Sequence, residues 1–124
     1  MSALSAKPAL RRKILVIDDE PVVAGVYARY LKRKGCDVLE MNSGEGLADR
    51  VSQFCPDVVL LDLVMPGING MEVLRQIKRF SPDVKVVIIT AVKDEMMLEI
   101  CRKLGASDYI VKPIELSHLD NKVL

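Results

Sequence analysis

Short runs of apolar residues alternate along the chain with longer segments in which apolar residues recur every three or four positions. Four of the short runs are rich in valine, isoleucine and leucine, which is typical of buried strands: residues 14–17, 58–61, 84–89 and 109–111. A fifth run, residues 36–41, alternates apolar and polar side chains. The pattern therefore predicts five strands.

Segments with helical spacing follow these runs, and each has a start or a stop signal. The first begins at Pro21 and ends before Gly35, and the second is capped by Asn42 or Ser43 and ends before Pro56. The other helices are predicted over residues 70–80, 93–104 and 115–124.

Strands that alternate with helices and read as continuous Val, Ile and Leu runs are typical of a parallel sheet covered on both faces. The sequence thus predicts an α/β, doubly wound domain with a five-stranded parallel sheet in the flavodoxin-like order 2-1-3-4-5 and helices on both faces. In this architecture ligands bind beyond the carboxyl ends of the strands, where the strand order reverses. That point lies between the first and third predicted strands.

Composition and charge exclude several classes of protein. The formal net charge of +1 offers no reason to bind nucleic acid or an anionic membrane, so we expect neither partner. No apolar stretch approaches the ~20 residues that cross a bilayer. The first residues also lack the apolar segment of a secretory signal, so we expect a cytoplasmic protein.

The three cysteines, Cys36, Cys55 and Cys101, lack the spacing of a redox or zinc site and are predicted to be small buried side chains. The single histidine, His118, is predicted to lie at the surface.

The chain is predicted to be one domain with a short tail. Residues 1–12 are expected to form a flexible N-terminal tail, and residues 13–124 the domain. The last predicted helix has only ~2.5 turns, which is short for closing the edge of a doubly wound sheet. We therefore expect this helix to be truncated and any output domain to lie outside this chain.

Polar residues stand at the carboxyl ends of four predicted strands. Asp18 and Asp19 follow the first strand, Asp62 follows the third, Thr90 follows the fourth and Lys112 follows the fifth. Because such ends meet at one edge of a parallel sheet, these side chains are predicted to share a pocket. Three neighbouring carboxylates repel one another unless a cation lies among them, and Mg²⁺, which prefers oxygen ligands, suits this set best.

The lysine and the threonine supply donors that can hold the oxygens of a phosphoryl group during in-line transfer. An aspartate carboxylate can accept such a group as an acyl phosphate. Asp62 stands alone at the end of the central strand, whereas Asp18 and Asp19 form an adjacent pair suited to a metal. Asp62 is therefore the predicted acceptor.

From Lys13 onward, the sequence resembles the receiver domain of two-component response regulators. Four motifs carry the resemblance: IDDE at residues 17–20, LDLVMPGING at 61–70, ITA at 89–91 and GASDYIVKP at 105–113. The resemblance implies a signalling switch, and not an enzyme beyond its own phosphorylation and dephosphorylation.

The resemblance also implies roles for the strand-end residues. Asp62 accepts the phosphoryl group from a phosphohistidine of a sensor histidine kinase or a phosphotransfer protein. Asp19 and Asp62 bind Mg²⁺ directly, with Mn²⁺ as a substitute, and Asp18 acts through metal-bound water. The backbone carbonyl of Val64 supplies a further metal ligand. Lys112 pairs first with the acceptor and then with the phosphate.

The resemblance further implies a cis peptide bond before Pro113, which directs the lysine into the pocket. Thr90 and Tyr109 are the implied switch residues: the threonine hydroxyl moves toward the phosphate, and the aromatic ring fills the space behind it. This movement reshapes the face of the fourth helix, fifth strand and fifth helix, through which a homodimer is expected. The mechanism is a population shift between two packings.

Two positions near the acceptor are apolar where similar domains often have polar groups that position the hydrolytic water. They are Val64, two residues after Asp62, and Val92, two residues after Thr90. The hypothesis that follows is a slow loss of phosphate.

The sequence disfavours three alternative functions. A haloacid dehalogenase-type phosphohydrolase places its nucleophile in an Asp-x-Asp motif after the first strand, which residues 18–21 do not match. A flavodoxin-like FMN carrier needs a hydroxyl-rich or glycine-rich phosphate loop where this chain has acids. A degenerate receiver that binds partners without phosphorylation is not supported, because all five strand-end residues are present.

Overall fold

The computed structural model describes residues 11–124. A five-stranded sheet is built from β2 (Lys13–Ile17), β3 (Asp37–Met41), β4 (Val58–Leu61), β7 (Lys85–Thr90) and β8 (Asp108–Val111). The helices that follow these strands are α2 (Pro21–Arg33), α3 (Leu47–Phe54), α4 (Gly70–Phe80), α5 (Glu95–Lys103) and α6 (His118–Val123). Two short strands, β5 (Val64–Met65) and β6 (Ile68–Asn69), form an antiparallel hairpin before α4.

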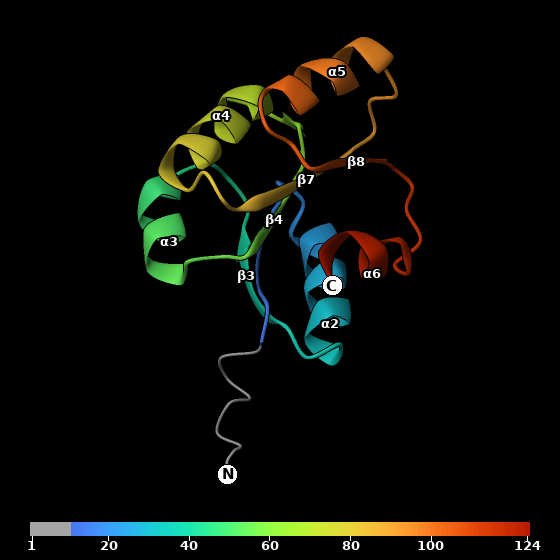
Figure 1. Cartoon of the computed structure of the whole chain (residues 1–124). Coiled ribbons are helices and arrows are strands. Elements are labelled where there is room, and N and C mark those ends of the chain that lie inside the picture. Colours follow the sequence, from blue (N-terminus) through green and yellow to red (C-terminus); the bar gives the residue numbers. More distant parts are fainter. Residues whose placement is uncertain (1–10) are drawn as a thin grey trace.

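The strand order of the sheet is β3-β2-β4-β7-β8, and every pair of neighbouring strands is parallel. When only these strands are counted, this is the order 2-1-3-4-5, so the predicted topology is confirmed. Figure 1 shows α2 and α6 on one side of the sheet and α3, α4 and α5 on the other. The order reverses between β2 and β4, the two strands that lead to the aspartates.

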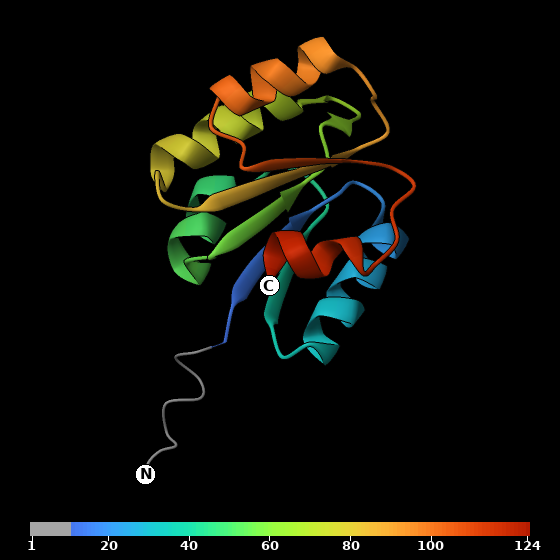
Figure 2. The ribbon, with the colours of Figure 1, turned by 45° about the vertical axis from the view of Figure 1, so that its right-hand side comes forward.

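Alternating side chains of the strands supply two hydrophobic cores, because successive residues of a strand point to opposite faces of the sheet. In β2, Leu15 and Ile17 pack in the core under α3, α4 and α5, whereas Ile14 and Val16 pack under α2 and α6. All of β4 is buried. Figure 2 shows α2 and α6 together below the sheet, and Tyr30 of α2 donates a hydrogen bond to Asp120 of α6 at 2.7 Å.

The second helix differs from its prediction. It begins at Leu47, after Gly46 in a left-handed conformation (φ 73°), and neither Asn42 nor Ser43 caps it. Glycines are poor helix formers, and Gly44 and Gly46 together leave the residues after the strand in a loop. The hairpin of β5 and β6 was also not predicted, and the last helix begins at His118 instead of residue 115.

The cysteine prediction is right for two residues and wrong for one. Cys36 and Cys101 are buried, but Cys55 is exposed. Cys55 ends α3 in a left-handed conformation (φ 53°), which turns the chain toward Pro56 and leaves the side chain at the surface. The predicted surface position of His118 is confirmed.

The first ten residues of the predicted N-terminal tail lie outside the described part of the chain. Arg11 and Arg12 are exposed, and the Arg11 guanidinium lies 3.5 Å from the carboxylate of Asp37. Among the helices of residues 11–124, none combines the length and the apolar character needed to span a bilayer.

Candidate functional site

An acidic cup lies at the carboxyl ends of β2 and β4. Asp18 and Asp19 follow β2, and Asp62 follows β4, whose Ile17↔Leu61 register brings the two strand ends level. One carboxylate oxygen from each aspartate lies within 4.8 Å of the others. The backbone fixes this arrangement, because the Asp62 N–H donates to the Ile17 carbonyl at 3.0 Å. The structure thus brings the three predicted carboxylates together.

Both carboxylate oxygens of Asp62 are engaged. Oδ1 accepts a hydrogen bond from the backbone N–H of Val64 at 3.0 Å, and Oδ2 lies 3.2 Å from Nζ of Lys112. The residue is only 6% exposed, so the carboxylate is almost fully shielded from solvent.

Lys112 bridges two of the acids. Its ammonium lies 3.2 Å from Asp62 and 3.3 Å from Asp18, and the lysine side chain is only 21% exposed. The peptide bond between Lys112 and Pro113 is cis. The two carboxylates raise the pKa of Lys112 against the opposing effect of burial, which is the largest single influence. Lys112 therefore remains an ammonium throughout the neutral pH range.

Burial raises the pKa of Asp62, and the Val64 hydrogen bond and the Lys112 charge reduce this increase without cancelling it. A carboxyl whose pKa is higher in the folded than in the unfolded protein destabilises the fold once it is ionised. This penalty is absent below the ordinary pKa of 3.8, grows as pH rises toward the folded pKa, and is complete above it.

An uncharged side chain at position 62 removes that penalty. We therefore expect Asp62→Asn to have an equal or higher free energy of unfolding at pH 7 in EDTA, with an advantage over the parent that shrinks toward pH 3. Urea unfolding at both pH values measures this. Asp83→Asn, an exposed acid remote from the cup, is the control and should change little. A clear loss of stability in Asp62→Asn alone would contradict this account.

The side chains of Thr90 and Tyr109 both form hydrogen bonds with the backbone of Val92. The Thr90 side chain is fully buried, and its hydroxyl oxygen accepts a hydrogen bond from the Val92 N–H at 3.3 Å. The Tyr109 hydroxyl donates to the Val92 carbonyl at 2.8 Å. Burial raises the pKa of Tyr109, so it is a neutral phenol that donates at physiological pH. One residue of the loop after β7 thus connects the two predicted switch side chains.

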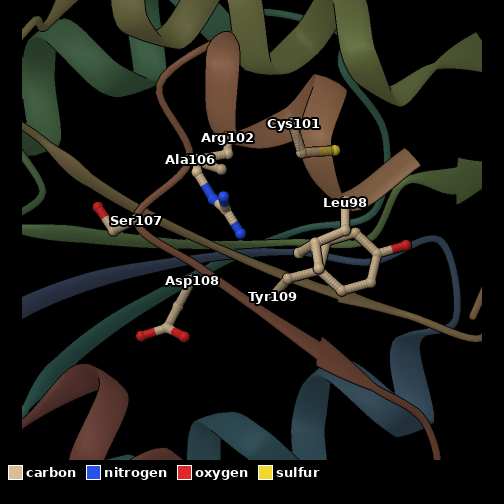
Figure 3. A pocket seen from close by; sticks show the side chains of 7 residues that line it. All are labelled: Leu98, Cys101, Arg102, Ala106, Ser107, Asp108 and Tyr109. Carbon is tan, nitrogen blue, oxygen red and sulfur yellow. The ribbon is translucent and has the colours of Figure 1, made fainter. Parts of the chain in front are cut away.

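A pocket of about 210 Å³ lies between α5 and β8, away from the acidic cup. Its lining includes Leu98, Cys101, Arg102 and Tyr109 (Figure 3). Figure 3 shows the Tyr109 ring at one end of this pocket, with its hydroxyl directed away from Arg102. The half-buried ring therefore belongs to the face of the molecule formed by α5 and β8.

The side chains of the acidic cup fit a hard divalent cation. Three carboxylates converge, two of them almost fully buried, and the cluster contains no thiol or imidazole. Oxygen ligands from carboxylates are those that Mg²⁺ prefers, and zinc or copper would favour nitrogen or sulfur. The residues that could hold the ion are Asp18, Asp19 and Asp62.

Two contacts of the site were not foreseen. The Glu20 N–H donates to Oδ1 of Asp18 at 3.0 Å, and Nδ2 of Asn42 donates to the Asp18 carbonyl at 2.9 Å. The second contact follows from the register, since Ile17 of β2 faces Met41 of β3 and the next residues, Asp18 and Asn42, therefore adjoin. The sequence could reveal this contact only through that register, which the half-buried edge strand β3 specifies weakly.

Fold and site together define a class of protein: flavodoxin-like domains that carry an acidic cup and a lysine at the point where the strand order reverses. Within this class, the family model of the response regulator receiver domain matches residues 14–124. The chain therefore belongs to the response regulator receiver domain family, and the sequence-based identification is confirmed.

Solved structures agree with this assignment. A CheY-like receiver domain protein from Methanospirillum hungatei JF-1 is 25% identical, with 91% of this chain and 90% of that chain covered and a TM-score of 0.85. The receiver domain of a LuxO-type repressor from Vibrio parahaemolyticus is 27% identical, with coverages of 92% and 88% and a TM-score of 0.84. The BeF3-activated N-terminal receiver domain of RstA from Klebsiella pneumoniae is 30% identical, with coverages of 90% and 97% and a TM-score of 0.79.

Proposed function

We propose that this chain is a phosphorylation-controlled switch in which Asp62 accepts a phosphoryl group from a phosphohistidine of a sensor kinase or a phosphotransfer protein. The observation that carries the proposal is the surroundings of Asp62: two further carboxylates within 4.8 Å and an ammonium at 3.2 Å. Family membership and the BeF3-activated state of the RstA domain support it.

In the proposed reaction an oxygen of Asp62 forms a bond to phosphorus while the bond from phosphorus to the histidine nitrogen breaks, and the imidazole takes up a proton. A bound Mg²⁺ supplies positive charge for the phosphoryl oxygens. Asp18, Asp19, Asp62 and the Val64 carbonyl would hold the ion. Lys112, already paired with Oδ2 of Asp62, binds the transferred group after the reaction.

The proposed output of phosphorylation is a repacking around Val92. If the Thr90 hydroxyl turns to the new phosphoryl group, it gives up its hydrogen bond with the Val92 N–H. The Val92 carbonyl, which anchors Tyr109, belongs to the next peptide along the chain, so a shift of residue 92 would also free the aromatic ring to change position. Such a change would reshape the face of α5, β8 and α6, where Met96 is 75% exposed and a homodimer contact is proposed.

Incubation with acetyl phosphate tests the proposed function. We expect intact-protein mass spectrometry to show a gain of one phosphoryl group with Mg²⁺ or Mn²⁺ present, because the ion offsets the charges of the acidic cup and of the donor. In EDTA the gain should fall by at least about 10²-fold, since removal of one major electrostatic group typically costs that much. Equal phosphorylation with and without metal would contradict the proposed cation.

The apolar side chain of Val64, two residues after the acceptor, predicts that the phosphoryl group is long-lived. Val64 is 57% exposed at the rim of the cup and has no polar group that could orient an attacking water. We therefore expect the phosphoryl group to persist for minutes or longer after acetyl phosphate is removed. Val64→Gln should shorten its half-life by about tenfold, less than the ~10²-fold effect of a full general base.

Val26→Gln is the matched control for this measurement, because it introduces the same side chain at an exposed valine of α2. It should leave the half-life unchanged. A half-life of seconds in the parent protein would refute the hypothesis that apolar neighbours slow the hydrolysis.

A further inference from the structure

Asn42, the first residue after β3, contacts the backbone of the acidic cup. Its side-chain Nδ2 donates to the Asp18 carbonyl at 2.9 Å, and the preceding residue, Met41, accepts from the Asp18 N–H at 3.0 Å. A backbone carbonyl oxygen can only accept, so the amide nitrogen is the atom that must face it. The end of β3 therefore holds both polar backbone groups of Asp18.

The Asp18 side chain is also held, by the Glu20 N–H on one oxygen and by Lys112 on the other. The half-buried Asp19 differs, because its carboxylate accepts no hydrogen bond from residues 11–124. Its direction depends on its backbone, and the peptide that joins it to Asp18 contains the carbonyl that Asn42 binds.

We propose that Asn42 is a positioning residue for the divalent cation: it fixes the peptide between Asp18 and Asp19 so that both carboxylates point into the cup. The proposal rests on the proposed function, which places the cation there. Residues that hold metal ligands in place typically contribute about 10- to 100-fold to metal affinity, because the ligands are then already oriented before the ion binds. Asn42 is not a catalytic residue in this account, because it touches a carbonyl of the backbone and not the acceptor.

Calorimetric titration of the unphosphorylated protein with Mg²⁺ alone tests the proposal. We expect Asn42→Ala to weaken the affinity by about tenfold. Ser43→Ala is the matched control: this neighbouring side chain contacts the Glu45 N–H at 3.3 Å and not the cup, so the affinity should stay that of the parent. Loss of one partly buried hydrogen bond should lower the melting midpoint of Asn42→Ala by only a few degrees in EDTA, so all three proteins stay folded at the temperature of the titration.

The outcomes separate the two proposals. If the parent protein binds Mg²⁺ and Asn42→Ala binds it equally well, the positioning role of Asn42 is overturned and the proposed function stands. A lower melting midpoint in EDTA with an unchanged Mg²⁺ affinity also overturns it, because Asn42 would then serve only the fold. If the parent itself shows no Mg²⁺ binding, the cation of the proposed function fails first, and this inference fails with it.

Discussion

Replacement of Asp62 by asparagine is expected to abolish phosphorylation. The amide keeps the size of the side chain and can still accept from the Val64 N–H, but its oxygen is a far poorer nucleophile than a carboxylate and forms no stable acyl phosphate. Loss of the nucleophile of a covalent mechanism typically costs about 10⁶-fold in rate. Intact-protein mass spectrometry after acetyl phosphate and Mg²⁺ should therefore show the unmodified mass.

The control for this loss is the Asp83→Asn protein, which changes the same charge at an exposed site and should gain a phosphoryl group like the parent. Because Asp62→Asn is expected to be at least as stable as the parent in EDTA, failure to fold does not explain an absence of phosphate. If the phosphoryl group persists in Asp62→Asn, the acceptor is another side chain, and the neighbouring acids of the cup would have to be tested in turn.

Most of the sheet could be predicted because burial on both faces leaves a direct trace in the sequence. All four residues of β4 are buried, and its run of Val and Leu admits few other structures. The parallel arrangement then places every strand end at one edge, which is why Asp18, Asp62 and Lys112 could be predicted to lie together from the sequence. The acidic cup follows from topology more than from any single motif.

Contacts made by surface loops were not predictable in the same way. The contact of Asn42 with Asp18 depends on the register between two strands, and the mostly half-buried side chains of the edge strand β3 specify that register only weakly. Asn is also a favoured helix cap, so its local propensity predicted that Asn42 caps the second helix and not that it binds the Asp18 carbonyl. Cys55 is exposed because its own backbone is left-handed, a conformation that is uncommon for residues other than glycine and therefore hard to predict.

The substitution Gly70→Ala is expected to destabilise the fold strongly. Gly70 is the first residue of α4 and is buried, and a Cβ atom built there would lie 2.4 Å from the carbonyl oxygen and 2.6 Å from the Cα of Leu63. Both atoms belong to the backbone, so the clash cannot be relieved by a side-chain rotation. We expect Gly70→Ala to lower the free energy of unfolding by about 3 kcal/mol, the upper part of the range for overpacked sites, as measured by urea unfolding.

Gly70→Ala should also slow phosphorylation, because Leu63 lies between Asp62 and Val64, and the Val64 N–H is a hydrogen-bond partner of the acceptor. Gly25→Ala is the matched control: it lies within α2, and an added Cβ would meet only the tips of the Arg29 and Glu40 side chains at 4.0 Å. There the same substitution should raise the stability by about 0.5–1 kcal/mol, since alanine is the better helix former. Equal effects of the two substitutions would show that the close approach of α4 to Leu63 does not constrain the loop that carries the acceptor.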